Sequence, residues 1–428
     1  MKIHLLGIGG VGMSALAQAY LDMGYAVQGA DRELDKGGTS ETLETLRREG
    51  VKFFPEAGGA GIDGSVDALV ITTAIEANHP GLAAAEKAGV RVVHRAKALA
   101  EIVNKRRLIA VTGTCGKSTV TAMLGHILAE LGADPLVVNG AAVTGWDADG
   151  TRVGSVRNGK GEIAVIEADE SDKSLVAYKP WGVVVTNASA DHYGEDEMNR
   201  VFDAFIASSS GGPVVDGRKG LPEQNGMEQL PMPGKHNRAN ALLAMQMARM
   251  ALPGVEPERV REAMGTFGGV VRRLEKIGER VYDDYAHNTE KLKAALVALQ
   301  ELHPQGVAMM WRPHGYAPLR KMKDSLAEMF VHTLRRQDVL VLPPVYDAGG
   351  TADRSVNSQD LVKAMIALDP CAKVNLAETL DEAEAFLLES EAATPGMAVA
   401  VCGARDPALP HLARRLAKRI DGKESKQQ

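Results

Sequence analysis

The chain has 428 residues, which is too long for a single hydrophobic core and predicts three domains. With 45% hydrophobic and 24% charged residues it has the composition of an ordinary globular protein, and its net charge of -6 gives no electrostatic reason to expect nucleic acid or an anionic membrane as a partner. Its three cysteines are too few and too scattered for a disulfide framework or a zinc site. Because we find no signal peptide and no apolar run that could span a membrane, we expect a cytoplasmic protein.

The first residues are typical of a strand, a glycine turn and a helix that hold a diphosphate. Residues 2–6 have a strand pattern. Gly7, Gly9 and Gly12 form a G-x-G-x-x-G turn, and Asp31 follows after a second strand pattern. Taken alone, this fingerprint serves NAD as well as another diphosphate, such as that of a UDP-sugar. Further strands are expected at 68–72 and 90–93.

A second phosphate-binding turn is expected in residues 109–120. β-Forming residues there run into two glycines and then into a helical pattern, so several backbone N–H groups at a helix N-terminus point at one place. Lys117 is expected to reach the phosphates, and the hydroxyl of Ser118 or Thr119 to ligate Mg²⁺. The full P-loop pattern needs another glycine where this chain has Val111, so an ordinary tight turn remains the alternative.

Two more groups of strand patterns predict two more α/β units. The second unit has strands near 163–167 and 182–186, which end in polar residues. In an open parallel sheet, ligands bind beyond the carboxyl ends of the strands, so these polar residues are candidates for a site. The third unit has strands at 307–310, 339–342 and 398–401. We therefore predict an α/β fold with domains at residues 1–105, 106–268 and 269–428.

Six motifs, taken together and in this order, resemble those of the Mur ligases. They lie at residues 7–14, 113–119, 167–172, 186–192, 233–237 and 283–287. The ordered combination is far more specific than any one of them. The resemblance implies a three-domain architecture in which a Rossmann-like N-terminal domain binds a UDP-sugar, a P-loop-type central domain binds ATP, and a Rossmann-like C-terminal domain binds an amino acid.

The resemblance also implies an activity, that of an ATP-dependent amide ligase in peptidoglycan precursor synthesis. Its substrates would be UDP-N-acetylmuramate and an amino acid, expected to be L-alanine, with ATP and Mg²⁺ as cofactors, in a monomer or dimer without stable membrane association. The chemistry makes the same demand, because a carboxylate must first be activated as an acyl phosphate before an amine can attack it. Positioned cations and hydrogen-bond donors must then hold several anions together.

Three alternatives stay open beside this activity. One is a ligase that adds a preformed peptide to the same nucleotide sugar, and another is a non-catalytic homologue that binds the UDP-sugar. The third is a nicotinamide-dependent oxidoreductase, which would leave Lys117, Glu167 and His192 unexplained.

Candidate residues for catalysis and nucleotide binding follow from the resemblance. The catalytic set is Lys117, Glu167, His192 and Arg273, and the Mg²⁺ ligands are Ser118, Glu167 and His192. The ATP-binding set is Gly113, Thr114, Gly116, Lys117, Ser118, Thr119, Asn187, His236, Asn237, Asn240, Arg272, Arg273 and Asp284. Other Mur ligases use a modified lysine near His192, but this chain has no lysine between Lys179 and Lys219, so we expect the glutamate–histidine version. The alternatives without a catalytic role are that Glu167 is a solvent-exposed acid in a loop and that His192 is a turn residue.

Candidate residues for the two other substrates complete the site. The UDP-sugar set is Gly9, Gly10, Val11, Gly12, Met13, Asp31, Thr73 and His94. The amino-acid set is Tyr285, His287, Arg312, His314 and Arg320.

The amino-acid end departs from the family's pattern. Gly315 and Pro318 stand where family members that add alanine usually have two arginines, which are thought to meet the amino acid and the phosphate. A zwitterionic amino acid needs a cation for its carboxylate. Arg312 and Arg320 are the nearest candidates, of which we favour Arg320, and two surface charges are the alternative.

Overall fold

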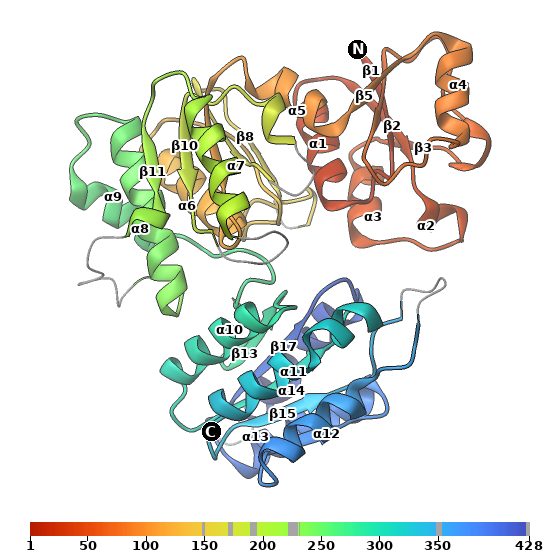
Figure 1. The fold of residues 1–428 in the computed structure, drawn as a ribbon. Helices are drawn as coiled ribbons and strands as arrows, with labels where there is room; N and C mark the ends of the chain where they lie inside the picture. The colour runs from red at the N-terminus through yellow and green to blue at the C-terminus, as the bar shows by residue number, and fades with distance from the viewer. Residues whose placement is uncertain are drawn as a thin grey trace. The chain divides into compact units, whose positions relative to one another are not determined.

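The structure is a computed structural model that describes residues 1–147, 150–169, 174–188, 195–220, 230, 232–347 and 353–424. The main chain divides into two compact units. The first comprises residues 1–231 and 238–270, and the second comprises residues 232–237 and 271–428. The first unit contains two β-sheets and the second unit contains a third (Figure 1).

The first sheet has five parallel strands in the order β3-β2-β1-β4-β5. The strands are β1 (Lys2–Leu6), β2 (Ala26–Ala30), β3 (Lys52–Phe53), β4 (Ala68–Ile71) and β5 (Arg91–His94). The helices are α1 (Val11–Asp22), α2 (Arg32–Asp35), α3 (Glu41–Arg48), α4 (Pro80–Ala88) and α5 (Arg95–Val103). The strand order reverses between β1 and β4, and the crevice beyond the carboxyl ends of such strands is where doubly wound sheets bind ligands.

The second sheet has six strands in the order β11-β10-β6-β9-β7-β8. The strands are β6 (Arg107–Thr112), β7 (Leu136–Val138), β8 (Val156–Asn158), β9 (Ile163–Glu167), β10 (Gly182–Val185) and β11 (Val214–Asp216). The helices are α6 (Lys117–Glu130), α7 (Glu195–Ala207), α8 (Lys235–Ala251) and α9 (Pro257–Gly265). Residues 108–111 of β6 are fully buried, as expected for a central parallel strand that is covered on both faces.

The third sheet also has six strands, in the order β12-β13-β17-β14-β15-β16. The strands are β12 (Glu275–Lys276), β13 (Val281–Asp284), β14 (Val307–Arg312), β15 (Val339–Leu342), β16 (Val374–Leu376) and β17 (Ala398–Gly403). The helices are α10 (Thr289–Leu302), α11 (Tyr316–Thr333), α12 (Ser358–Leu368), α13 (Leu380–Ala393) and α14 (Ala408–Glu424).

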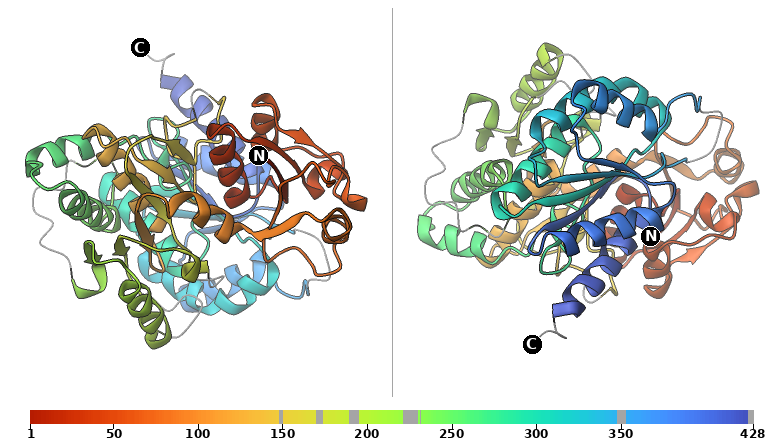
Figure 2. Two further views of the ribbon diagram at one scale, coloured as in Figure 1. Left: turned by 90° about the horizontal axis from the view of Figure 1, so that it is seen from above. Right: turned by 90° about the horizontal axis from the view of Figure 1, so that it is seen from below.

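Helices cover both faces of the third sheet (Figure 2). Successive residues of β14 alternate between two cores, because side chains of a strand point to opposite faces. Met309 and Trp311 pack with residues of α10, α11 and α12, whereas Ala308 and Met310 pack with residues of α13 and α14. Ligands can therefore reach this sheet only at the ends of its strands.

The predicted α/β class is confirmed, since β7–β8 and β12–β13 are the only antiparallel pairs among the described strands. The predicted domain boundaries after residues 105 and 268 fall between the sheets and remain a prediction. None of the helices that the structure describes is both long and apolar enough to cross a bilayer.

Candidate active site

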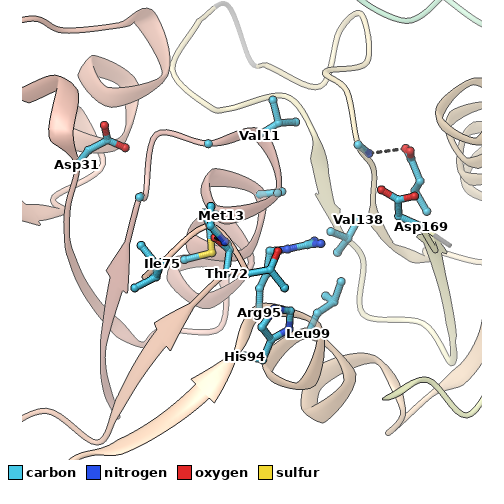
Figure 3. A pocket seen from close by; sticks show the side chains of 18 of the residues that line it. Val11, Met13, Asp31, Thr72, Ile75, His94, Arg95, Leu99, Val138 and Asp169 are labelled. Carbon is cyan, nitrogen blue, oxygen red and sulfur yellow. Dashed lines mark hydrogen bonds between the residues drawn. The ribbon is translucent and has the colours of Figure 1, made fainter. Parts of the chain in front are cut away.

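One cavity of about 600 Å³ lies in the first unit and is lined by residues from both of its sheets (Figure 3). Residues predicted to bind the UDP-sugar make up one end, namely Gly10, Val11, Gly12, Met13, Asp31, Thr73 and His94. The other end contains Gly140, after β7, and Glu167 and Asp169, at the end of β9. The cavity thus connects the predicted UDP-sugar residues with a predicted catalytic carboxylate.

The turn after β1 exposes the N-terminus of α1 to the cavity. Gly10 is the N-cap of this helix and has no side chain to cap it, so its first N–H groups are available to an anion. Gly12 lies against Arg95, because a β-carbon at Gly12 would be 2.9 Å from Nη1 of that arginine. Arg95 itself lines the cavity beside His94 (Figure 3). A helix N-terminus and a guanidinium together suit a diphosphate.

Asp31 stabilises this turn. Its Oδ2 accepts a hydrogen bond of 2.8 Å from the N–H of Gly9, the one predicted UDP-sugar residue that does not line the cavity. Its Oδ1 accepts a hydrogen bond of 3.0 Å from the N–H of Glu33 and so caps α2. The Asp31 carboxylate therefore fixes two backbone segments, the turn after β1 and the start of α2 after β2.

The second predicted phosphate loop connects β6 to α6, so the predicted order of strand, turn and helix is confirmed. Gly113 and Gly116 both have positive φ, of 125° and 86°. Neither position has room for a side chain, since a β-carbon at Gly113 would lie 2.1 Å from Oγ1 of Thr186 and one at Gly116 would lie 2.5 Å from Oδ1 of Asn240. Glycine is therefore required at both positions by backbone conformation and by space.

Asn187 holds the tip of this loop. Its Oδ1 accepts a hydrogen bond of 3.0 Å from the N–H of Cys115, and its Nδ2 donates one of 2.8 Å to the Cys115 carbonyl. The Asn187 carbonyl also accepts a hydrogen bond from the N–H of Thr114. The predicted ATP-binding residue Asn187 thus shapes the loop.

Lys117, at the end of this loop, lies beside Asp169, which lines the cavity together with Glu167. Nζ of Lys117 donates a hydrogen bond of 2.7 Å to the Gly113 carbonyl and lies 3.8 Å from Oδ1 of Asp169. Glu167 accepts a hydrogen bond of 2.9 Å from the N–H of Gly140, where a β-carbon would lie 2.3 Å from Oε2 of Glu167. A cation, an acidic pair and a helix N-terminus are the groups that phosphoryl transfer requires.

The donors for Mg²⁺ are of a suitable kind. The Ser118 hydroxyl, in the first turn of α6, and the Glu167 carboxylate are oxygen ligands, which Mg²⁺ prefers. Mg²⁺ usually takes only one or two carboxylates and keeps several waters, so a dense cluster of acids is not needed. Within the described residues no three His, Cys, Asp or Glu side chains gather as a metal site. The third predicted ligand, His192, lies outside the described residues.

Two further predicted ATP-binding residues, His236 and Asn237, lie in the first turn of α8. Nδ2 of Asn237 donates a hydrogen bond of 2.7 Å to the Pro233 carbonyl, which fixes the entry to this helix.

Arg272 and Arg273 differ in their surroundings, although both lie about 5 Å from the ring centroid of Tyr285, at 5.2 and 5.1 Å. Nε of Arg272 lies 3.1 Å from Oδ2 of the buried Asp283, and its Nη2 donates a hydrogen bond of 2.7 Å to the Gly403 carbonyl. Arg273 makes no hydrogen bond or ion pair with any residue of the described chain. Of the two arginines predicted for the ATP phosphates, Arg273 is therefore the available one.

Asp283 and Asp284 are buried beside these arginines. Burial raises the pKa of Asp283 to about 6, and the Arg272 charge opposes this shift. Burial also raises the pKa of Asp284, against the charge of Arg273. Both oxygens of Asp284 accept backbone N–H groups, from Leu274 and Ala286. Asp284, predicted to lie near the ATP ribose, thus organises the backbone on either side of β13.

The predicted amino-acid residues include a cluster of three rings. Tyr285 and His287 follow β13, and His314 follows β14. The ring centroids of Tyr285 and His287 are 5.7 Å apart, and those of His287 and His314 are 5.2 Å apart, both edge to face. Burial, followed by the charge of Arg405, lowers the pKa of His314, which favours its neutral form.

The two predicted carboxylate-binding arginines are both engaged by other side chains. Arg312 forms an ion pair with the buried Asp406 and donates a hydrogen bond to the Pro344 carbonyl. Arg320 lies 2.8 Å from Oδ2 of Asp353 and donates a hydrogen bond of 3.0 Å to the Ser355 hydroxyl. Their role in substrate binding remains a prediction.

Two residues that line the cavity, Arg95 and Gly140, were not predicted from the sequence. A signal was present for Arg95, since it follows His94 directly at the end of a predicted strand. No sequence signal distinguishes Gly140, because its contact with Glu167 joins segments 27 residues apart.

Three Rossmann-like sheets, a glycine turn between β6 and α6, and a cavity lined by residues of the first and second sheets are typical of a multidomain nucleotide-binding enzyme. Residues 2–107 match the family model of the Mur ligase family catalytic domain, residues 111–207 the Mur ligase middle domain, and residues 272–405 the Mur ligase glutamate ligase domain. The chain belongs to the Mur ligase family, as the motifs predicted, and is thus an ATP-dependent ligase. This assignment leaves no support for the nicotinamide alternative.

Named relatives are found over most of the chain. A UDP-N-acetylmuramate–L-alanine ligase of Sinorhizobium fredii is 32% identical, and the match covers 94% of each chain. One of Brucella anthropi is 31% identical over 84% of this chain and 86% of that protein.

Solved structures are similar over nearly the whole chain. The UDP-N-acetylmuramate-alanine ligase of Thermotoga maritima has a TM-score of 0.78 at 24% identity, covering 99% of this chain and 100% of its own. A murein peptide ligase of Psychrobacter arcticus has a TM-score of 0.61 at 20% identity, covering 98% of each chain. At these identities the two structures show a common fold.

Proposed function

We propose that the protein joins L-alanine to the lactyl carboxylate of UDP-N-acetylmuramate, with ATP as the energy source and an acyl phosphate as the intermediate. The relatives that carry this activity in their names support it, at 31–32% identity over most of the chain. The observation that carries the proposal is that one continuous cavity is lined by both the N-terminus of α1 and the Glu167 carboxylate. A nucleotide sugar whose diphosphate lies at α1 extends its acyl end toward Lys117 and Glu167.

The first step activates the carboxylate. A carboxylate oxygen of the sugar attacks the γ-phosphorus of ATP, the bond to ADP breaks, and an acyl phosphate forms. The backbone N–H groups at the N-terminus of α6 hold the phosphates, and Lys117 offsets the charge that develops on the transferring group. Ser118, Glu167 and His192 would hold Mg²⁺, which would neutralise phosphate charge.

The second step forms the amide. The deprotonated amine of alanine attacks the acyl carbon, the carbon–oxygen bond to phosphate breaks, and inorganic phosphate leaves. The pKa of His314 is lowered by burial, so its neutral ring can accept a proton from the amine. We take L-alanine as the acceptor amine because the sequence relatives are named L-alanine ligases.

Because UDP-sugars are cytoplasmic metabolites in peptidoglycan precursor synthesis, we place the reaction in the cytoplasm. We expect a monomer or dimer, which light scattering after size-exclusion chromatography measures.

Phosphate release tests the proposed function. Purified protein is incubated with ATP, Mg²⁺ and UDP-N-acetylmuramate, together with each of a panel of amino acids and peptides. Release that depends on the nucleotide sugar and is fastest with L-alanine supports the proposal. Release with peptides alone would instead identify a peptide-adding ligase, and no release with any amine would identify a non-catalytic homologue.

A further inference from the structure

The amino-acid carboxylate requires a cation, and the arginines nearest to the family's expected positions are poorly suited to supply it. Gly315 and Pro318 provide no charge. The side chain of Arg312 is only 16% exposed and is paired with Asp406, which is 3% exposed. If Arg312 turned to a substrate, it would leave the Asp406 carboxylate buried without a charged partner, which is strongly unfavourable. Arg320 is held by Asp353 and Ser355.

Arg405 lies at the same edge of the third sheet as the ring cluster. β17 runs between β13 and β14, and its residue Cys402 is paired in register with both Asp284 and Trp311. Arg405 follows the end of β17 by two residues, as His314 follows Arg312, the end of β14. Tyr285 and His287 follow β13 directly. The carboxyl ends of these three adjacent strands thus carry two histidines, a tyrosine and an arginine, at the edge where parallel sheets bind ligands.

The backbone presents the Arg405 side chain to solvent. Arg405 is exposed, whereas Ala404 and Asp406 on either side of it are buried. Asp406 is fixed by its ion pair with Arg312 and by a hydrogen bond of 2.9 Å from the N–H of Ala408. Arg405 has a φ of 66°, in the left-handed region that is unfavourable for a residue with a side chain. Such strain in a rigid setting is a feature of ligand-binding positions.

Arg405 is also available to a ligand. It forms no hydrogen bond or ion pair with any other residue that the structure describes. Its charge is close enough to His314 to lower the pKa of that ring. Nδ1 of His314 is buried and lacks a hydrogen-bond partner among the described residues. An exposed cation beside two histidine rings at one strand edge suits a ligand that has both a carboxylate and an amine.

We infer that Arg405 binds the carboxylate of the acceptor amino acid, in place of the arginines absent at positions 315 and 318. The guanidinium forms two parallel hydrogen bonds with the carboxylate, an arrangement that lysine cannot reproduce. The amine of the amino acid then lies toward His314 and His287. This inference rests on the proposed function and assigns the residue that distinguishes an amino acid from an amine without a carboxylate.

The test compares L-alanine with L-alaninamide, which has the same amine and side chain but no carboxylate. The variants are Arg405→Ala, Arg405→Lys and, as a matched control, Arg336→Ala, an exposed arginine just before β15. KM and kcat are measured for both amines, and KM for ATP and UDP-N-acetylmuramate. Arg405→Ala should raise KM for L-alanine about 10- to 100-fold, the loss of a charged hydrogen-bonded pair, and should bring the two amines close to equal. Arg405→Lys should have an intermediate KM for L-alanine, and Arg336→Ala should have the KM of the wild type.

The outcomes separate the inference from the proposed function. If the wild type uses L-alanine and Arg405→Ala keeps both its KM for L-alanine and its preference over L-alaninamide, the inference fails while the proposed function stands. If KM for ATP rises as much as KM for L-alanine, Arg405 acts through the fold and the inference also fails. If the wild type uses no amino acid at all, both are overturned.

Discussion

The carboxylate of Glu167 accepts a hydrogen bond of 2.9 Å from the backbone N–H of Gly140, which aims it into the cavity. Because this carboxylate is a proposed Mg²⁺ ligand, Glu167→Ala should raise the Mg²⁺ concentration for half-maximal activity more than it raises KM for ATP. His192→Ala should do the same. Gly140→Ala should act in the same direction, since its β-carbon would displace the carboxylate. Mg²⁺ titrations that coincide with the wild type would remove Glu167 from the metal site.

Lys117 lies between the phosphate loop and Asp169, so its charge is placed to offset that of a transferring phosphoryl group. Lys117→Ala should lower kcat by about 100-fold or more, the usual effect of removing one such group from a preorganised site. Steady-state phosphate release measures this. Lys179→Ala, which removes an exposed lysine of the same unit, is the control. Wild-type turnover by Lys117→Ala would show that the phosphate loop is assigned wrongly.

Cys115 is half-buried at the tip of the phosphate loop, with its backbone held by Asn187. Alkylation with iodoacetamide should inactivate the enzyme by obstructing this loop, and MgATP should protect it. Because the loop is held through backbone atoms, Cys115→Ala should keep its activity and resist the reagent. Mass spectrometry of the labelled peptides distinguishes Cys115 from the exposed Cys371 and the buried Cys402. Labelling of Cys115 that MgATP does not slow would contradict the assignment.

The pKa of His314 is lowered by burial and by the positive charge of Arg405. Removing that charge takes away one of the two causes, so Arg405→Ala should raise the pKa of His314 while burial still keeps it below its ordinary value. The ring resonances of His314, followed by NMR as a function of pH, measure this shift, and His314→Asn identifies them. An unchanged or lower pKa in Arg405→Ala would place Arg405 too far from His314 for the proposed site.

The strands and the glycine turns that follow them were predictable because local sequence determines them. Runs of apolar β-formers such as residues 163–167 and 339–342 became strands with the predicted bounds. Gly113 and Gly116 indicated a turn, because only glycine tolerates both the backbone angles and the close contacts found there. Short edge strands such as β8 and β12, which have little apolar pattern of their own, were not predicted.

The amino-acid site was harder to predict because it depends on contacts that are distant in sequence. The ion pair that occupies Arg312 joins residues 94 positions apart, so Arg312 looked available in the sequence. Arg405 becomes a candidate only once the strand order places β17 between β13 and β14. Proximity in sequence to Gly315 and Pro318 selects Arg312 and Arg320, whereas a parallel sheet brings together strand ends that are distant in sequence.

The transfer of a heavy oxygen isotope shows whether the carboxylate of UDP-N-acetylmuramate is activated by phosphorylation. The lactyl carboxylate is labelled, the enzyme is supplied with ATP, Mg²⁺ and L-alanine, and the released phosphate is analysed by mass spectrometry. An acyl phosphate intermediate leaves one carboxylate oxygen on the phosphate, so we predict one labelled oxygen per phosphate released and the other in the new amide. Phosphate without the label, whether or not the amide product forms, would show that no carboxylate oxygen is transferred and would exclude the acyl phosphate intermediate.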